Sequence, residues 1–277
     1  MPSESQIFAA HSSYQNAILA HFERHLHEIV LKAVTRVTGK LHWSLTTTLG
    51  VIDQTPANIR VLRNLNNLIM TEMNAAGYGT LVDTFVGEFP GQFPFLKQII
   101  EGLSEQVQTP FPPLKFSATD LGILDSVALN AASSLQTVME SVAGAAMQRG
   151  MFAVGGLPFA QLVETLGTRL GKGIAEARTI GDTSMSVFYA TMNDRAFQAI
   201  QDDVPELTLR YRYSGPQDKL EREFCRHLTS MNKNYTRAEI DAMNNGMLPN
   251  VWITRGGWNC RHQWSLFTGD LQTSQAA

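Results

Sequence analysis

The chain contains only two cysteines, Cys225 and Cys260, and each is followed two positions later by a histidine. The tripeptide Cys-Arg-His therefore occurs twice, ending at His227 and at His262. Thiolates and imidazoles are the ligands that Zn²⁺ prefers in proteins, and four of them make a closed structural site. Zinc binding is therefore the first chemistry that this region suggests.

The spacing limits which of the four residues could share one ion. If Cys225 lies on a helix, His227 points about 200° away from it, because a helix has about 3.6 residues per turn. On an extended strand, Cys260 and His262 point the same way. The pattern therefore favours a three-ligand site of Cys225, Cys260 and His262. The simpler alternative, which we prefer, is a direct Cys225–Cys260 contact, reduced or bridged, because cysteine behaves as a small buried hydrophobic residue.

Nearby polar residues could also do acid–base chemistry. Asp218, Arg222 and His262 offer a carboxylate, a cation and an imidazole, as general acid–base catalysis in a cleft requires. The alternative is that these residues only stabilise the fold through hydrogen bonds, an arrangement that we call the lock. In it, Asp218 caps the turn after Gly215 and pairs with Arg222 four residues later on a helix. We favour the lock, whose members would be Asp218, Arg222, Cys225, Cys260, Arg261 and His262.

The same region is rich in aromatic and basic residues. Trp252, Trp258 and Trp264 lie within thirteen residues of one another, and such side chains form small cores, bind protein partners or stack on bases. The basic residues make this region more positive than the rest of the chain. The residues expected to contact DNA or a partner are Lys219, Arg226, Arg255 and Trp258.

We expect a small α/β region at residues 205–267, the cap, to bring these residues together. Residues 207–213 alternate apolar and polar, which predicts a half-buried strand. Residues 218–228 have a helical stripe, and Thr236 with Glu239 forms a capping box. Residues 251–253 and 262–267 are predicted as two further strands.

The first two hundred residues have helical periodicity. Helices are expected at 6–37, 56–76, 95–107, 119–149 and 159–200, the last broken near 167–173 because glycine destabilises helices. Proline and glycine predict a loop at 88–94 and an extended connector at 109–113. The fold class is thus mainly α, with a long-helix body and a small α/β C-terminal cap. The expected divisions are 1–108, 114–204, the cap at 205–267 and a frayed tail at 268–277.

Composition excludes some classes of protein. The formal net charge is −3, so the chain lacks the overall positive charge of a dedicated DNA-binding protein. No apolar run is long enough to span a bilayer, and the N-terminus does not have the pattern of a signal peptide. We expect a soluble protein made in the cytoplasm with reduced cysteines.

The C-terminal third resembles the minor head, or head-morphogenesis, proteins of tailed bacteriophages. The resemblance covers about residues 160–267. It is carried by Tyr213-x-Gly-Pro-x-Asp218, by Arg222-x-x-Cys225 and by the string Gly-Gly-x-Asn-Cys-Arg-His that ends at His262.

The resemblance implies a structural role rather than catalysis. Proteins of this family lie at the portal vertex, contact the portal or connector, and in some cases associate with the packaged genome. We therefore expect a non-enzymatic virion protein of the capsid or neck, present in several copies, without a bound cofactor or a membrane contact. The competing hypothesis is a phage-encoded enzyme, a metal-assisted nuclease or toxin-like transferase, that uses Asp218, Cys260 and His262.

Overall fold

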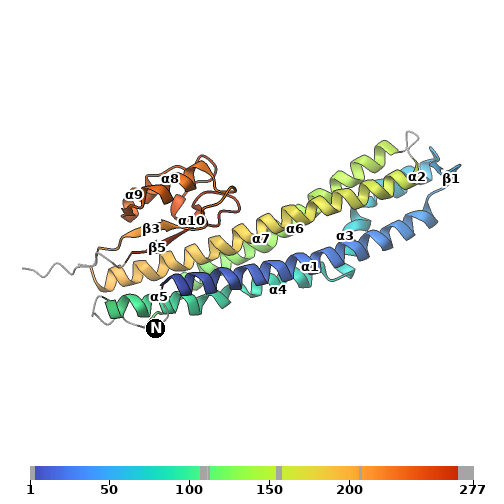
Figure 1. Cartoon of the computed structure of the whole chain (residues 1–277). Coiled ribbons are helices and arrows are strands. Elements are labelled where there is room, and N and C mark those ends of the chain that lie inside the picture. Colours follow the sequence, from blue (N-terminus) through green and yellow to red (C-terminus); the bar gives the residue numbers. More distant parts are fainter. Residues whose placement is uncertain (1–3, 107–110, 112, 154–157, 206–207, 268–277) are drawn as a thin grey trace, which may run out of the picture. The chain divides into compact units, whose positions relative to one another are not determined.

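The computed structural model describes residues 4–106, 111, 113–153, 158–205 and 208–267, and these are mainly α-helical (Figure 1). The expected fold class, a long-helix body with a small α/β cap, is confirmed. The helices are α1 (Glu4–Ser44), α2 (Pro56–Arg63), α3 (Leu65–Ala75), α4 (Tyr78–Gly87), the 3₁₀ helix η1 (Phe89–Gln92), α5 (Phe93–Gln106), α6 (Ala118–Ala153), α7 (Phe159–Asp203), α8 (Glu223–Met231), α9 (Arg237–Asp241) and α10 (Val251–Thr254). The strands are β1 (Thr47–Thr48), β2 (Val51–Ile52), β3 (Tyr211–Ser214), β4 (Asn234–Tyr235) and β5 (Gln263–Leu266).

Two predicted segments fall largely outside this description. The predicted tail 268–277 lies outside the described residues, as does most of the predicted connector 109–113. Among the described helices, none combines enough length with enough apolar character to cross a bilayer.

The chain forms two compact units, each built from separate stretches of sequence. Unit 1 consists of Met1–Gln15, Glu88–Leu129 and Asp182–Ala277, and unit 2 consists of Asn16–Gly87 and Asn130–Gly181. The long helices α1, α6 and α7 each contribute residues to both units. The cap belongs to unit 1.

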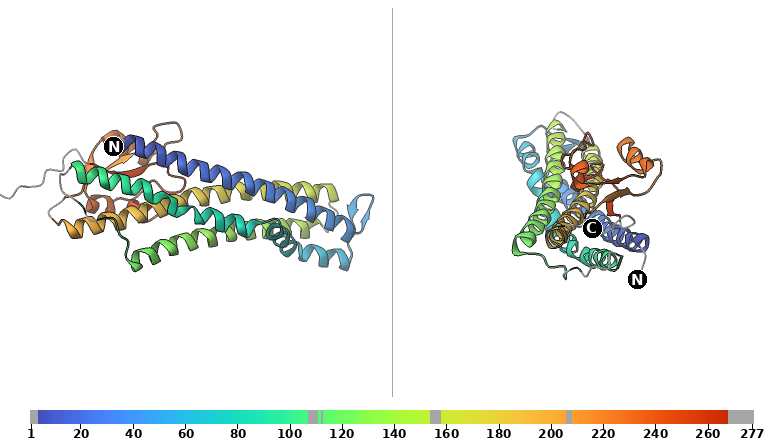
Figure 2. Two further views of the ribbon diagram at one scale, coloured as in Figure 1. Left: turned by 90° about the horizontal axis from the view of Figure 1, so that it is seen from below. Right: turned by 90° about the vertical axis from the view of Figure 1, so that its left-hand side faces the viewer.

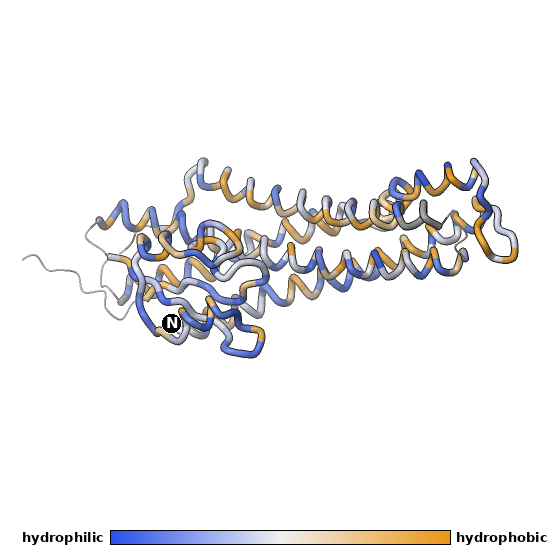
Figure 3. Tube along the Cα trace, turned by 90° about the horizontal axis from the view of Figure 1, so that it is seen from above, coloured by the Kyte–Doolittle hydropathy of each residue, from blue (hydrophilic) through white to orange (hydrophobic). Residues whose placement is uncertain are grey.

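Unit 2 is held together by apolar side chains of its helices. Hydrophobic and hydrophilic residues alternate along the long helices, as they do in amphipathic helices (Figure 3). Phe22 packs on Phe85 with a centroid distance of 4.5 Å. Tyr78 is fully buried, and its hydroxyl donates a 2.6 Å hydrogen bond to the carbonyl of Leu135. The tyrosine hydroxyl is thereby satisfied inside the core.

The predicted break in α7 is wrong, since one helix runs from Phe159 to Asp203. A Cβ at Gly173 would lie 3.0 Å from Val142 Cγ2 and 3.2 Å from Met139 Sδ, which shows how closely α6 approaches α7 at this point. Burial of apolar surface at such a contact offsets the destabilisation of about 1 kcal/mol that a glycine brings to a helix interior.

A two-residue hairpin follows α1 in unit 2 (Figure 2). Strands β1 and β2 are antiparallel, and Leu49 and Gly50 both have positive φ, as a tight hairpin turn requires. Buried Asn58 holds the ends of the hairpin, because its side-chain amide donates to the carbonyls of Thr46 and Asp53.

The predicted loop at 88–94 is also wrong. Here η1 leads directly into α5 at Phe93. Pro90 lies in the first turn of η1, where its missing N–H leaves no hydrogen bond unmade. Gln92 is fully buried and accepts a 2.9 Å hydrogen bond from His11 Nε2, which fixes this segment within unit 1.

The cap contains a three-stranded antiparallel sheet in the order β4-β3-β5. In Figure 1 this sheet lies between α7 and the short helices α8, α9 and α10. Residues Tyr211 and Tyr213 are buried, with rings 4.5 Å from Trp252 and 4.7 Å from Trp264 respectively. Trp252 and Trp264 therefore belong to a small core, which is one of the roles expected for the tryptophans, whereas Trp258 is exposed.

The predicted elements of the cap are partly confirmed. The strand expected at 207–213 is present only in its last part, as β3 from Tyr211, because 208–210 are not in a strand and residue 207 lies outside the described residues. The strand expected at 262–267 is β5, and the capping box of Thr236 and Glu239 is formed. The strand expected at 251–253 is wrong, because these residues form α10 behind an Asn250 N-cap. The helix expected from Asp218 begins only at Glu223.

Candidate metal centre in the cap

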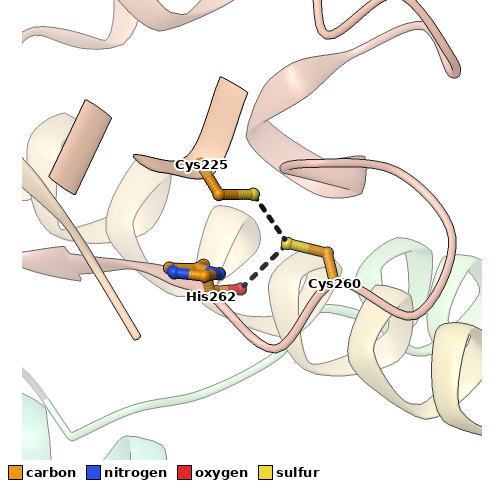
Figure 4. Close-up of side chains that lie close together, drawn as sticks. All are labelled: Cys225, Cys260 and His262. Atoms are coloured by element: carbon orange, nitrogen blue, oxygen red, sulfur yellow. Dashed lines mark hydrogen bonds between the residues drawn. The ribbon is translucent and has the colours of Figure 1, made fainter. Parts of the chain in front are cut away.

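Cys225, Cys260 and His262 lie together inside the cap (Figure 4). Cys225 is on α8, Cys260 lies in the loop after α10, and His262 immediately precedes β5. Their ligand atoms all lie within 4.8 Å of one another, and the two sulfurs are 3.8 Å apart. The predicted Cys225–Cys260 contact is confirmed, with both thiols free. His227 is exposed on α8, in agreement with the exclusion predicted from helical spacing.

Glycines make this convergence sterically feasible. A Cβ at Gly256 would lie 2.3 Å from Cys225 Sγ and 3.0 Å from Cys260 Sγ. The backbone N–H of Gly256 donates a 3.3 Å hydrogen bond to Cys260 Sγ. Gly257 has a φ of 89° and starts the turn that returns the chain to Cys260. The Gly-Gly pair therefore provides both the space and the turn that the cysteine pair needs.

Tyr213 completes the polar contacts of the sulfurs. Its hydroxyl lies 3.4 Å from Cys225 Sγ and 3.3 Å from Cys260 Sγ. Its ring stacks on the imidazole of His262, with a centroid distance of 5.3 Å and an interplanar angle of 4°. Burial raises the pKa of the Tyr213 phenol, so the hydroxyl keeps its proton and can donate to a sulfur.

The two thiols differ in their affinity for a proton. The sulfur–sulfur hydrogen bond lowers the pKa of Cys260 and raises the pKa of Cys225. The buried guanidinium of Arg255 also favours a thiolate at Cys260. Within this hydrogen-bonded pair, the surroundings therefore favour the thiolate form at Cys260 and the protonated thiol at Cys225.

A buried carboxylate faces His262. Glu221 Oε1 lies 3.2 Å from His262 Nε2, and the side chains of both residues are less than a twentieth exposed. Thr229 Oγ1 donates a 2.8 Å hydrogen bond to the same carboxylate oxygen. Glu221 therefore lies at ion-pair distance from one side of the imidazole ring, although His262 Nε2 makes no hydrogen bond among the described residues.

The outer part of the cluster is an ion-paired turn. Arg261 donates to Asp218 from the two terminal nitrogens of its guanidinium, Nη1 and Nη2, at 2.7 Å and 2.6 Å. This interaction lowers the pKa of Asp218 to about 2. Asp218 Oδ1 also accepts a 2.9 Å hydrogen bond from the N–H of Leu220, so the predicted turn cap is confirmed.

The predicted Asp218–Arg222 pair is wrong. Asp218 precedes α8, so the two residues do not have the i, i+4 relation of a helix. The guanidinium of Arg222 instead donates to the carbonyls of Gly256 and Trp258. Arg222 still belongs to the lock, through backbone contacts with the loop that carries Cys260.

The residues expected to contact DNA or a partner have different environments. Lys219 and Arg226 are exposed, and Trp258 is 44% exposed, so these three remain predicted contact residues. Arg255 is only 6% exposed, and its Nη1 donates to the carbonyl of His262 at 3.3 Å. The prediction that Arg255 serves as a surface contact is therefore wrong.

Two residues of the site were not predicted from the sequence. Tyr213 was predicted only as part of a half-buried strand and of the motif, although the alternation along β3 does place it on the buried face. Glu221 carries no spacing signal toward His262, because the two residues are 41 positions apart and meet only in the folded cap.

Comparison of the chain with protein-family models, with curated proteins and with solved structures found no match. The fold and site define a mainly α-helical protein whose small α/β cap is closed by a buried Cys₂His cluster.

Proposed function

We propose that this protein is a structural component of a tailed-phage virion, a minor head protein at the portal or neck vertex. It would be made in the host cytoplasm and incorporated in several copies, in contact with the portal or connector and additionally with packaged DNA. The observation that carries this proposal is that the residues on which the resemblance rests converge on one interlocked cluster.

Each part of the motif has a structural contact. Gly215 lies against His262, and Asp218 binds Arg261. Arg222 holds the loop of the Gly-Gly pair, and that loop brings Cys260 to Cys225. A motif whose members mainly contact one another maintains a fold. This pattern supports a structural role for the cap.

The placement of the competing catalytic residues argues against an enzyme. Cys260 and His262 are buried, and Asp218 is held by Arg261. A surface hollow of about 730 Å³ lies beside α8, but Asp218, Cys260 and His262 are not among the described residues that line it. General acid–base catalysis requires groups within hydrogen-bond reach of a substrate.

A groove in unit 2 offers a surface for a protein partner. Its volume is about 1120 Å³, and it is lined by residues of α1, α2 and α3. Four cations surround it, namely Arg36, Lys40, Arg60 and Arg63, while the carboxylate in it, Glu72, is paired with Lys40. Apolar Val61 and Leu68 also line it, and Trp43 is 88% exposed.

We assign this groove to an acidic segment of the portal or connector. Carboxylates of such a segment would pair with Arg60 and Arg63, which make no ion pair in the described part of the chain. Trp and Arg are the residues that most often dominate protein interfaces. The groove therefore combines the charge and the aromatic anchor of a docking surface.

Quantitative mass spectrometry of purified virions from the source tests the proposed role. We expect this chain in a fixed low ratio to the portal protein, near one to one. Absence from the particle would overturn the proposal and return attention to an enzyme that uses Asp218, Cys260 and His262. A His262→Ala variant that still folds and assembles but lacks a measurable activity would favour the enzyme as well.

A further inference from the structure

We propose that Cys225, Cys260 and His262 bind a Zn²⁺ ion that fastens the three segments of the cap together. The inference is independent of the proposed virion role, because it depends only on donor atoms inside the cap.

The separation of the two sulfurs fits a shared zinc ion. At Zn–S distances of about 2.3 Å, two sulfurs of a tetrahedral site lie about 3.8 Å apart. Cys225 Sγ and Cys260 Sγ are 3.8 Å apart. The S–S bond of a disulfide is about 2.05 Å long, so the two sulfurs are not bonded to each other. Their separation is instead the one that two ligands of a single zinc ion have.

The imidazole of His262 has the surroundings that are typical of a histidine bound to zinc. Histidines that bind zinc usually engage a carboxylate through the other ring nitrogen. Glu221 Oε1 lies 3.2 Å from His262 Nε2, and Thr229 holds that carboxylate at 2.8 Å. Figure 4 shows one ring nitrogen on the side of Cys260 and the other directed away from it. Nδ1 is therefore the ligand atom.

Donors to the sulfurs fit thiolate ligands. The N–H of Gly256 lies 3.3 Å from Cys260 Sγ, and the Tyr213 hydroxyl lies within 3.4 Å of both sulfurs. A neutral apolar pocket would not need such donors, whereas thiolates bound to zinc keep negative charge that they stabilise. Two thiolates also balance the charge of the ion, and one acidic and one basic side chain, Glu221 and Arg255, are buried beside the site.

The cluster supplies three protein ligands. Among the described residues, no further histidine, cysteine or carboxylate joins the group. Three protein ligands leave the fourth position of the tetrahedron open to a water molecule. The ion would link α8, the loop after α10 and the start of β5.

The chain offers a matched control for each ligand. His227 occupies in the first Cys-Arg-His the position that His262 occupies in the second, but it is exposed on α8. Glu223 is an exposed carboxylate two residues after Glu221. The variants to compare are therefore His262→Ala with His227→Ala, and Glu221→Gln with Glu223→Gln.

The experiment measures bound metal in the full chain, expressed with added zinc and purified under reducing conditions without an affinity tag. Elemental analysis should find about one zinc per chain in the unaltered protein and in His227→Ala. Cys225→Ser, Cys260→Ser and His262→Ala should lose it. Glu221→Gln should bind zinc about 10–100-fold more weakly than Glu223→Gln does.

Cobalt substitution reports the geometry in the unaltered protein, so the result does not depend on whether a variant folds. Co²⁺ should give strong visible bands of a tetrahedral site together with a thiolate-to-cobalt charge-transfer band, and zinc should displace it. Reduced protein that binds neither metal would overturn the proposal. So would His262→Ala that binds zinc as tightly as His227→Ala, or cysteines that are found as a disulfide in protein freshly purified without reductant.

Discussion

Gly215 lies directly against the imidazole of His262. A Cβ at Gly215 would come within 2.5 Å of His262 Cδ2 and within 2.8 Å of His262 Cα. The two residues are 47 positions apart, and the pairing of Ser214 with Gln263 between β3 and β5 brings them together. Position 215 must therefore be a glycine, because His262 occupies the space that a side chain would need.

Replacing this glycine should destabilise the cap. In Gly215→Ala the new methyl group must displace the His262 ring or its backbone, and overpacking of this kind costs about 1–3 kcal/mol. Gly122→Ala is the control, because a Cβ there meets nothing within 4 Å and alanine favours the helix. Urea unfolding should give a lower midpoint for Gly215→Ala and an unchanged or higher one for Gly122→Ala. Equal midpoints in the two variants would contradict the close contact.

The stability of unit 1 should fall as the solution becomes acidic, because His11 is buried as a neutral side chain. Burial lowers the pKa of His11 from 6.5 to about 4, and Arg255 acts in the same direction. Above pH 6.5 the contribution of His11 is constant. Between pH 6.5 and 4 the unfolded chain binds a proton that the folded chain does not, so the free energy of unfolding falls, by about 3 kcal/mol in total.

The His11 contribution is isolated by comparing His11→Gln with the unaltered protein. The variant can still hydrogen-bond Gln92 but does not titrate. Its free energy of unfolding should depend less on pH, by about 1.4 kcal/mol per pH unit between pH 6.5 and 4. If urea unfolding gives parallel pH profiles for the two proteins, His11 is not the neutral buried group described above.

The glycines of α7 should differ in their effect on stability. Gly171 is exposed, and a Cβ there would meet nothing within 4 Å, so Gly171→Ala should stabilise the chain by about 1 kcal/mol. At Gly173 the same change places a methyl group 3.0 Å from Val142, and the overpacking offsets that gain. Denaturant unfolding should rank Gly171→Ala above Gly173→Ala. The reverse order would show that α6 and α7 are not in close contact there.

Local signals predicted many elements of the fold correctly. The periodicity of residues 119–149 predicted most of α6, and Thr236 with Glu239 predicted the start of α9. The prediction failed where tertiary contacts overrode local preference. Val251, Trp252 and Ile253 have side chains that favour strands, yet they form α10 because Asn250 caps the turn and Trp252 packs on Tyr211.

The proposed zinc ligands could be predicted from the sequence, but the residues that contact them could not. With only two cysteines in the chain, the identity of Cys225 and Cys260 as a pair followed directly from composition. The partner of Asp218 was misassigned, because helical spacing pointed to Arg222 while the folded loop presents Arg261. Glu221 precedes α8 and His262 precedes β5, so the two residues meet only in the folded cap, and no spacing in the sequence encodes this contact.

Under the proposed virion role, reversing charges in the groove of unit 2 should reduce incorporation into virions. Arg60→Glu with Arg63→Glu replaces two cations that have no ion-pair partner in the described residues, so an acidic partner segment would be repelled. Exposed substitutions on a helix change stability by only about 0.5 kcal/mol, so the protein should still fold. Lys32→Glu with Lys172→Glu is the control, because these exposed cations do not line the groove.

The measurement is the number of copies per virion when each variant replaces the unaltered chain. We expect Arg60→Glu with Arg63→Glu to fall at least about 10-fold, which corresponds to about 1.4 kcal/mol of lost binding free energy. Trp43→Ala should act in the same direction, because it removes the exposed aromatic side chain beside the cations. The control pair should be incorporated normally. Equal incorporation of all variants would exclude this groove as the docking surface and direct the search to Lys219, Arg226 and Trp258 of the cap.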